Sequence, residues 1–403
     1  MAYKGIDYLR NKLAVKKPRV LLRYGFYDMK NTVRDLNIST PPELRYWSEA
    51  LGWCAKAVDS IADRLVFRTF DNDLYNMAGI FQANNQDVLV DSAIHGALVS
   101  SCDFIYISAG EDGFPRMRVI DGAHATGVID PLTNMLKEGY AVLEVDENDE
   151  PLIEAHFLDG ETVIYDRKRF GYSVPNAAPY PLLVPMINRP DAVRPFGHSR
   201  ITRACMDIMN GAIRTIKRSE IAAEFYSYPQ KYVLGMSEDA EQMDNWKATM
   251  SSFLRIDKDD DGDHPVVGQF QSTSMAPHAD QLRMLAGVFA GETGLTLDDL
   301  GFPSQNPSSS EAIKASHESL RLTARKAQRT FGTGLLNAGY LAACVRDNYP
   351  YFRSQVADTI LKWEPIFEPD AATLSVIGDG VIKINQGIPG YIDESKLRDI
   401  TGM

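Results

Sequence analysis

The sequence predicts an α+β protein in which a strand-rich part precedes several long helices. Three observations support this fold class: strand-like segments joined by tight turns between residues 103 and 172, a proline-rich break at 173–198, and long amphipathic helical patterns beyond that break. Strands that follow one another through short turns favour an antiparallel meander. Their separation from the helices is typical of α+β proteins rather than α/β proteins.

The first helical pattern covers residues 40–66. Thr40 and Glu43 form a capping box, and apolar residues then recur at alternating spacings of three and four. This periodicity predicts one amphipathic helix of about seven turns. A strand-like run at 66–70 and a second helix over 86–101 follow it.

Five segments between residues 103 and 172 are rich in β-branched and aromatic residues, as strands are. Asp112-Gly113 and Asp159-Gly160 lie between them and are typical of tight hairpin turns. We therefore expect one antiparallel meander. Its strands are predicted at 104–107, 116–120, 141–145, 152–157 and 162–165.

Beyond the proline-rich segment, helices at 199–228 and 276–297 flank a small insert at 229–275. Their apolar stripes are narrow, which is typical of helices that pack against similar helices, often from other subunits. An ordinary helical hairpin inside one domain is the alternative. The stripe residues expected to pack are Ile201, Cys205, Ile208, Ala212, Ile216, Leu282, Leu285 and Val288.

Residues 298–309 combine two prolines, a glycine and small polar side chains, which predicts a loop. Ser308 and Glu311 then form a capping box for the longest helical pattern, at 310–347. A helix of this length spans roughly 50 Å.

Three glycines in the second half of this pattern predict a kink or weak point in the helix. The tail at 348–403 reads as a small α/β piece that ends in a helix around 393–400. The three glycines are Gly332, Gly334 and Gly339.

The composition is that of a soluble globular chain of 403 residues, with 44% hydrophobic and 24% charged residues. The net charge of −12 argues against tight nucleic-acid binding. An acidic wall could still guide DNA, because it repels phosphates rather than holding them. No apolar run is long enough to span a bilayer, and the four scattered cysteines favour neither a zinc site nor disulfides.

Catalytic motifs are missing from the sequence. There is no G-x-x-x-x-G-K-[ST] segment to cradle ATP, and the seven histidines show no H-E-x-x-H or paired metal spacing. We therefore expect a protein that is not an enzyme, with no catalytic residues and no cofactor.

An acidic run at 257–264 raises the question of calcium. Asp257, Asp259 and Asp261 match the first, third and fifth positions of an EF-hand loop. The twelfth position is Gly268 instead of a glutamate, and Pro265 blocks the exit helix. The three aspartates are thus a weak candidate beside the simpler interpretation of a solvated turn, and no metal site is predicted.

Seven short segments, taken in order, resemble the portal proteins of tailed double-stranded DNA bacteriophages, in the siphovirus-type branch. None of them is a signature, but their order and spacing are specific, and the resemblance extends from about Tyr24 to the end of the chain. The segments are VDSIADRL at 58–65, IFQANNQD at 80–87, GHSRI at 197–201, FYSYPQ at 225–230, GQF at 268–270, ETGL at 292–295 and NPSSSEAI at 306–313.

The resemblance implies the portal fold and its division of the chain. The parts would be an α/β wing at 1–198, stem helices at 199–228 and 276–297, a clip at 229–275, a tunnel loop at 298–309, a long wing helix at 310–347, and a crown or wing segment at 348–403. The C-terminal part is too short for a large crown.

The resemblance also implies a function and partners. Twelve copies would form a ring at the capsid vertex, through which double-stranded DNA passes without sequence preference during packaging, retention and ejection. The ring would contact the major capsid and scaffolding proteins, the terminase large subunit and the head–tail adaptor. It would form in the host cytoplasm and reside in the virion, with no membrane contact.

Two other functions stay open at this point. Another head–tail ring protein, such as an adaptor, is usually shorter and lacks this order of elements. A phage nuclease or terminase large subunit would be an enzyme, and the missing ATP-binding motif and missing cluster of metal carboxylates count against it.

The tunnel loop that the resemblance implies would be the part that meets DNA. Asp298 and Asp299 would repel phosphate, and polar side chains after them would make transient hydrogen bonds. A plain surface loop between two helices is the alternative. The polar residues are Gln305, Asn306, Ser308 and Ser309.

Basic residues line one side of the long helical pattern. They would pair with acidic groups of a neighbouring subunit or contact phosphate. They could equally be a solvated helix face with local ion pairs of about 0.3–0.5 kcal/mol each. The residues are Lys314, Arg321, Arg325, Lys326 and Arg329.

Overall fold

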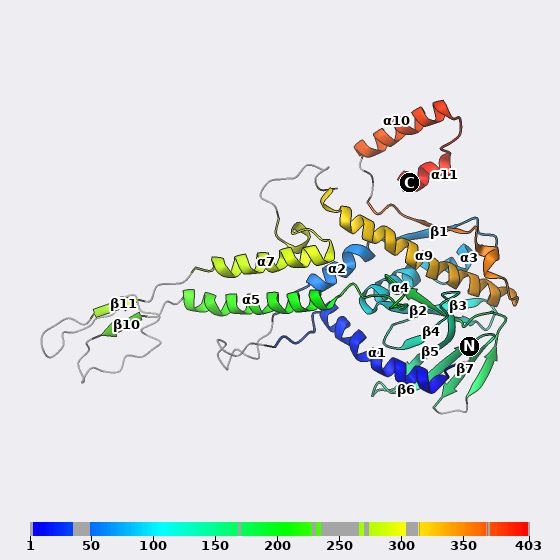
Figure 1. Ribbon diagram of the computed structural model, residues 1–403, viewed down its shortest axis with the longest axis horizontal. Helices are drawn as coiled ribbons and strands as arrows, with labels where there is room; N and C mark the ends of the chain where they lie inside the picture. The colour runs from blue at the N-terminus through cyan, green and yellow to red at the C-terminus, as the bar shows by residue number, and fades with distance from the viewer. Residues whose placement is uncertain are drawn as a thin grey trace. The chain divides into compact units, whose positions relative to one another are not determined.

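The chain divides into two compact units (Figure 1). Unit 1 comprises residues 1–31, 52–206 and 290–403, and unit 2 comprises residues 32–51 and 207–289. The computed structural model describes residues 3–34, 49–167, 171–227, 231–234, 266–269, 274–303, 313, 315–367, 369 and 371–401.

A three-stranded antiparallel sheet lies at the centre of unit 1, in the order β3-β2-β9. Its strands are β2 (Cys102–Ala109), β3 (Pro115–Ile120) and β9 (Leu183–Ile187). We expected residues 173–198 to be irregular, and β9 corrects this. Pro185 is tolerated within β9 because, among the described strands, β9 pairs only with β2, so the missing N–H can face away from the ladder.

A second, five-stranded sheet is an antiparallel meander in the order β4-β5-β6-β7-β8. The single predicted meander is therefore wrong, because residues 104–107 and 116–120 belong to the other sheet. The chain leaves β3 at Asp121, whose carboxylate accepts a hydrogen bond from the Ala123 backbone at 2.7 Å and so forms a turn before β4. The strands are β4 (Ala125–Ile129), β5 (Leu136–Val145), β6 (Pro151–Leu158), β7 (Glu161–Asp166) and β8 (Tyr172–Pro175).

Helices cover one face of the three-stranded sheet. Asp103 and Met186 are directly opposite each other in the β2–β9 ladder and so share a face. The Asp103 carboxylate lies against Gly96 of α4 (Gln86–Ser100), and the Met186 sulfur lies against Gly334 of α9 (Glu318–Asp347). Both helices therefore pack on this face, while Tyr106 on the other face meets Phe157 of β6 at 5.3 Å between ring centroids.

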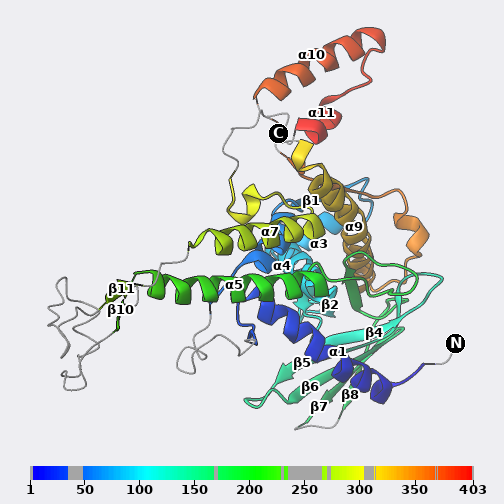
Figure 2. The same cartoon turned by 60° about the vertical axis from the view of Figure 1, so that its left-hand side comes forward.

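Helix α1 (Ile6–Tyr27) was not expected from the sequence, because it contains Pro18 and has no clear apolar stripe. It runs alongside the five-stranded sheet (Figure 2). Buried Leu9 and Leu13 pack there against Tyr140 and Val142. The start of the helix is fixed by the buried carboxylate of Glu138, which accepts backbone hydrogen bonds from residues 4 and 5 at 2.8 and 3.1 Å.

The helix predicted over 40–66 is shorter in the structure. Helix α2 spans Trp53–Ala62, the residues from 49 to 52 are not helical, and the capping box at Thr40 lies outside the described residues. Strand β1 (Phe67–Asp71) follows and pairs with β12 (Ile360–Trp363) from the C-terminal part. Helix α3 (Met77–Ala83) then leads to α4.

Helix α9 continues across its three glycines, so they do not interrupt its hydrogen-bonded course. These glycines are buried or lie against neighbours, and their role is close packing. A Cβ at Gly334 would lie 2.6 Å from the Met186 sulfur, and one at Gly339 would lie 2.9 Å from the Met77 sulfur. The helix begins at Glu318, whereas the expected start at 310 and its capping box lie outside the described residues.

The C-terminal part consists of β12, a 3₁₀ turn at Arg353–Val356, and helices α10 (Ala371–Gly387) and α11 (Glu394–Thr401). The prediction of a final helix around 393–400 is confirmed. Together with the two sheets and the helices of the remaining chain, it confirms the α+β fold class.

Unit 2 contains most of two long helices with a hairpin between them in the sequence. The helices are α5 (Arg203–Ser227) and α7 (Ala276–Thr293), and the hairpin pairs β10 (Lys231–Leu234) with β11 (Val266–Gln269). Gly211 of α5 faces Leu285 of α7, and a Cβ at Gly211 would lie 3.7 Å from the Leu285 side chain. The helix expected from Ser199 begins only at Arg203, because the Thr202 hydroxyl accepts the Cys205 N–H at 3.2 Å and caps it.

Candidate functional site

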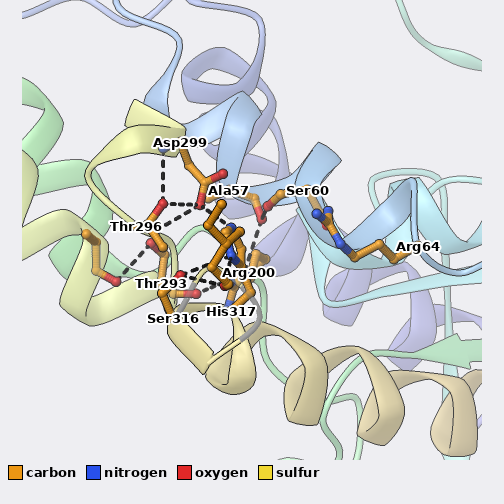
Figure 3. Close-up of polar contacts among 11 residues, drawn as sticks. Ala57, Ser60, Arg64, Arg200, Thr293, Thr296, Asp299, Ser316 and His317 are labelled. Atoms are coloured by element: carbon orange, nitrogen blue, oxygen red, sulfur yellow. Dashed lines mark hydrogen bonds and ion pairs between the residues drawn. The ribbon is translucent and has the colours of Figure 1, made fainter. Parts of the chain in front are cut away.

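The candidate site is the base of the 298–309 segment, meaning residues 293–299 at its start and residues 313 and 315–317 after it. Residues that are distant in the sequence meet there. Figure 3 shows Arg200 between Ala57 of α2 and Thr293 at the end of α7, with Asp299 and His317 nearby. All of these residues belong to unit 1.

Arg200 is a buried cation with carbonyl partners. Its Nε donates to the Ala57 carbonyl at 3.1 Å, and its Nη2 donates to the Thr293 carbonyl. Thr293 is the last residue of α7, so the guanidinium lies at the negative end of a helix dipole. Burial lowers the pKa of Arg200 to about 10, which leaves the side chain charged at neutral pH.

The neighbouring Ser199 fixes the chain on the other side of Arg200. Its hydroxyl donates to the Val99 carbonyl at 2.6 Å and accepts the Ile201 N–H at 3.0 Å. The Arg200 N–H donates to the Leu98 carbonyl at 2.8 Å. The GHSRI segment at 197–201 therefore ties the end of α4 to α2 and to the end of α7.

Asp299 is held by the residues around it rather than exposed in a loop. Residues Asp298–Leu300 form a 3₁₀ turn, and Oδ2 of Asp299 accepts the N–H and the hydroxyl of Thr296 at 2.9 and 2.8 Å. Nε2 of His317 lies 3.3 Å from the same oxygen. Burial alone would raise the pKa of Asp299, but the Thr296 hydrogen bonds and the His317 contact outweigh it and hold this pKa below its usual value.

His317 connects this carboxylate to the start of α9. Its Nδ1 lies 2.9 Å from the Ile313 carbonyl and 3.2 Å from the Ser316 hydroxyl, and its ring packs edge-on against Phe367 at 6.2 Å between centroids. No sequence pattern singles out His317, because its spacing to other residues matches no metal-binding or catalytic motif. Only the fold brings it to Asp299.

The structure describes only some of the residues that were predicted to contact DNA from the loop. The Asp299 carboxylate lies against Thr296 and His317, and its expected repulsion of phosphate stays a prediction. Asp298 is exposed in the 3₁₀ turn. The remaining predicted contacts lie outside the described residues: Gln305, Asn306, Ser308 and Ser309.

The basic side of α9 is present in the structure, except that Lys314 lies outside the described residues. Arg321 forms two hydrogen bonds with Glu318, each of 2.7 Å. Arg325, Lys326 and Arg329 are exposed, and their side chains form no ion pair with the described part of the chain. Among the four basic residues that the structure describes, local ion pairing therefore accounts for Arg321 alone.

The expected packing residues of the two long helices differ in burial. Cys205 and Ala212 are buried, and Ile201 is buried just before α5. Val288 is 51% exposed, contrary to a packing role within the single chain. The residues with intermediate burial are Ile208, Ile216, Leu282 and Leu285.

The metal candidates Asp257, Asp259 and Asp261 lie outside the described residues. Among the residues that the structure does describe, no cluster of histidine, cysteine, aspartate or glutamate could hold a metal ion. Within the same residues, no helix combines the length and apolarity that a membrane crossing requires.

Comparison with solved structures finds similar chains in gene transfer agent particles. One belongs to the neck of a native particle computed with C12 symmetry, with a TM-score of 0.45, 14% identity and coverage of 95% of this chain and 99% of that chain. Another belongs to the virion of a native particle, with a TM-score of 0.42, 12% identity and coverage of 87% and 89%.

Comparison with known sequences finds no matching family model but does find curated relatives. The portal protein of Mycobacterium phage L5 is 23% identical over 399 residues, which cover 93% of this chain and 80% of the relative. The portal protein of Mycobacterium phage D29 is 22% identical over 402 residues, which cover 94% of this chain and 81% of the relative. Over nearly its whole length, the chain is thus similar to two phage portal proteins.

Proposed function

We propose that this protein forms the portal vertex of a tailed phage. Copies of the chain form a ring around a channel, and double-stranded DNA passes through it during packaging, is retained by it, and leaves through it at ejection. The observation that supports this most is the similarity to two portal proteins over 93% and 94% of the chain. The proposed ring contains twelve copies, as the family resemblance implies.

The proposed parts follow the order of elements. The two long helices α5 and α7 with the β10–β11 hairpin between them support a stem at 199–228 and 276–297 with a clip at 229–275. The exposed Val288 supports helix packing against another copy. The wing is 1–198 with the long helix at 310–347, the tunnel loop is 298–309, and 348–403 is a crown or wing segment.

The proposed ring is passive and has no catalytic role. The sequence lacks an ATP-binding loop, so the packaging energy would come from a separate terminase large subunit that docks on the ring. The head–tail adaptor would bind the clip after packaging, and the major capsid and scaffolding proteins would surround the wing. The chain would assemble in the host cytoplasm and remain in the virion.

Electron microscopy of the purified chain tests this function. We expect rings with a central channel wide enough for a duplex, and mass photometry should give one discrete multiple of the 44.9 kDa subunit. A chain that stays folded and monomeric at high concentration, and that is also missing from the vertex of mature particles, would exclude a portal.

A further inference from the structure

An acidic face of unit 1 has no partner in the described chain. It consists of Asp63 at the end of α2 and Asp87 and Asp91 on α4, together with Val66 and Val88. The three carboxylates form no ion pair with the described residues. Val66 and Val88 are 45% and 69% exposed.

This face surrounds a hollow of about 1020 Å³ whose lining includes Asp63, Val66, Val88 and Asp91. The negative charges of the three carboxylates also repel one another. Partial burial raises the pKa of Asp91, and the nearby Asp87 and Asp63 raise it further. A cation placed at this face would relieve that repulsion.

A basic face of unit 1 is its counterpart. It consists of Arg325, Lys326 and Arg329 on α9, together with Leu322, which is 53% exposed. The side chains of the three cations form no ion pair with the described residues. Arg325 and Arg329 flank a groove of about 290 Å³ whose lining also includes Trp363.

The two faces match in spacing and in composition. Asp87 and Asp91 are four residues apart on α4, and Arg325 and Arg329 are four residues apart on α9, so each pair is separated by about 6 Å along its helix. Each face also places an exposed aliphatic side chain, Val88 or Leu322, beside its charges. Two such faces can bury apolar surface and pair charges at the same time.

The overall charge makes a second copy the fitting occupant. Each copy carries −12, so copies repel one another unless opposite charges meet locally. Pairing of two different faces of one chain is heterologous, and it repeats from copy to copy until a ring closes. Duplex DNA would explain the basic face but would be repelled by the acidic face.

We propose that, in the ring of the proposed function, the acidic face of one copy docks on the basic face of α9 of the next copy. The inference rests on that function, because only a head-to-tail ring uses both faces in every copy. A mutual contact between two identical faces would instead oppose like charges.

Charge reversal in the full chain tests this pairing. We expect D87R/D91R alone and R325D/R329D alone each to raise the concentration needed for half-assembly by about tenfold or more, because close interfacial charge pairs have large coupling energies. The matched controls E111R and K383D, at exposed positions outside both faces, should assemble as the wild type does. Circular dichroism and melting curves confirm that each variant is folded.

Mixing the two reversed proteins is the decisive arm. Each copy of D87R/D91R then carries two basic faces and each copy of R325D/R329D two acidic faces, so an equimolar mixture should form rings of alternating copies. The quadruple variant, with both faces exchanged, should also regain assembly. Mass photometry and electron microscopy measure all of these states.

Three outcomes would overturn the inference. If the wild type forms rings and the reversed variants assemble normally, the pairing of the two faces is overturned while the proposed function stands. Normal assembly of R325D/R329D with weakened binding of a short DNA duplex assigns the basic face to DNA instead. A wild-type chain that never forms rings overturns the proposed function and this inference together.

Discussion

Nε2 of His317 lies 3.3 Å from Oδ2 of Asp299, and this polar contact links the start of α9 to the 3₁₀ turn that follows α7. The same carboxylate oxygen accepts two hydrogen bonds from Thr296. The two ends of the intervening segment are thus held together at one carboxylate. If that segment is the tunnel loop, as proposed, its base is fixed here.

Replacing Asp299 with asparagine should loosen this base. The D299N side chain keeps its volume but loses its charge, which weakens the contacts with Thr296 and His317 by about 1 kcal/mol. We expect the amide hydrogens of residues 296–300 to exchange about fivefold to tenfold faster in hydrogen-exchange mass spectrometry. The control E292Q changes an exposed carboxylate in the last turn of α7, and equal exchange in both variants would contradict the role of Asp299.

The same carboxylate gives the base a defined response to acid. The pKa of Asp299 is lower in the folded chain than its usual value, so its contribution to stability is fully present above the ordinary carboxyl pKa near 3.9. It is lost as the pH falls through the lower folded-state pKa. The difference in exchange between the wild type and D299N should therefore be constant from pH 7 to about pH 5, should begin to shrink near pH 4, and should vanish only below the folded-state pKa of Asp299. A difference that disappears already at pH 6 would point to another group.

Arg200 should be essential for the stability of unit 1. The R200M variant keeps much of the apolar stem but leaves the carbonyls of Ala57 and Thr293 without their donor, at an expected cost of about 2–4 kcal/mol. R200K should be intermediate, because one ammonium group replaces the two-pronged guanidinium. Denaturant unfolding measures both changes. R19M, at an exposed position on α1, should unfold like the wild type.

The space around Gly334 in α9 and around Gly25 in α1 predicts opposite effects when each is replaced with alanine. G334A would place a Cβ 2.6 Å from the Met186 sulfur and 3.3 Å from the Pro185 carbonyl, so we expect a loss of about 1–3 kcal/mol. Gly25 in α1 has nothing within 4 Å, so G25A should be neutral or should stabilise by up to about 1 kcal/mol. Thermal melting of both variants measures the difference, and a destabilising G25A together with a neutral G334A would contradict this account.

The sequence predicted the elements whose signals are local. Alternating strand patterns and Gly-containing turns located β5 to β7, and long apolar stripes located α5, α7 and most of α9. It failed where a distant partner decides the structure. Strand β9 forms in a proline-rich segment because β2 supplies its ladder, and α1 forms despite Pro18 because Leu9 and Leu13 pack on β5.

The sequence prediction included Asp299 of the candidate site but not the contacts that this residue makes. Glycine, proline and polar residues marked the 298–309 segment as a loop, and that composition could not reveal that Asp299 faces inward. Its partner His317 lies beyond the loop in the sequence, and nothing in the spacing connects the two. The carbonyl partners of Arg200 are likewise invisible in sequence, because any residue type can supply a backbone carbonyl.

The 298–309 segment itself should be needed for handling DNA rather than for assembly. Deleting residues 302–307 leaves Asp299 and His317 in place, so rings and heads should form while less DNA is packaged or retained per particle. A variant that replaces 304–309 with a Gly/Ser run of equal length separates segment length from side-chain chemistry. Pulsed-field electrophoresis of DNA from purified heads measures the packaged length. Heads filled to normal length at the normal rate by the deletion variant would show that the segment is an ordinary surface connection and not a tunnel loop.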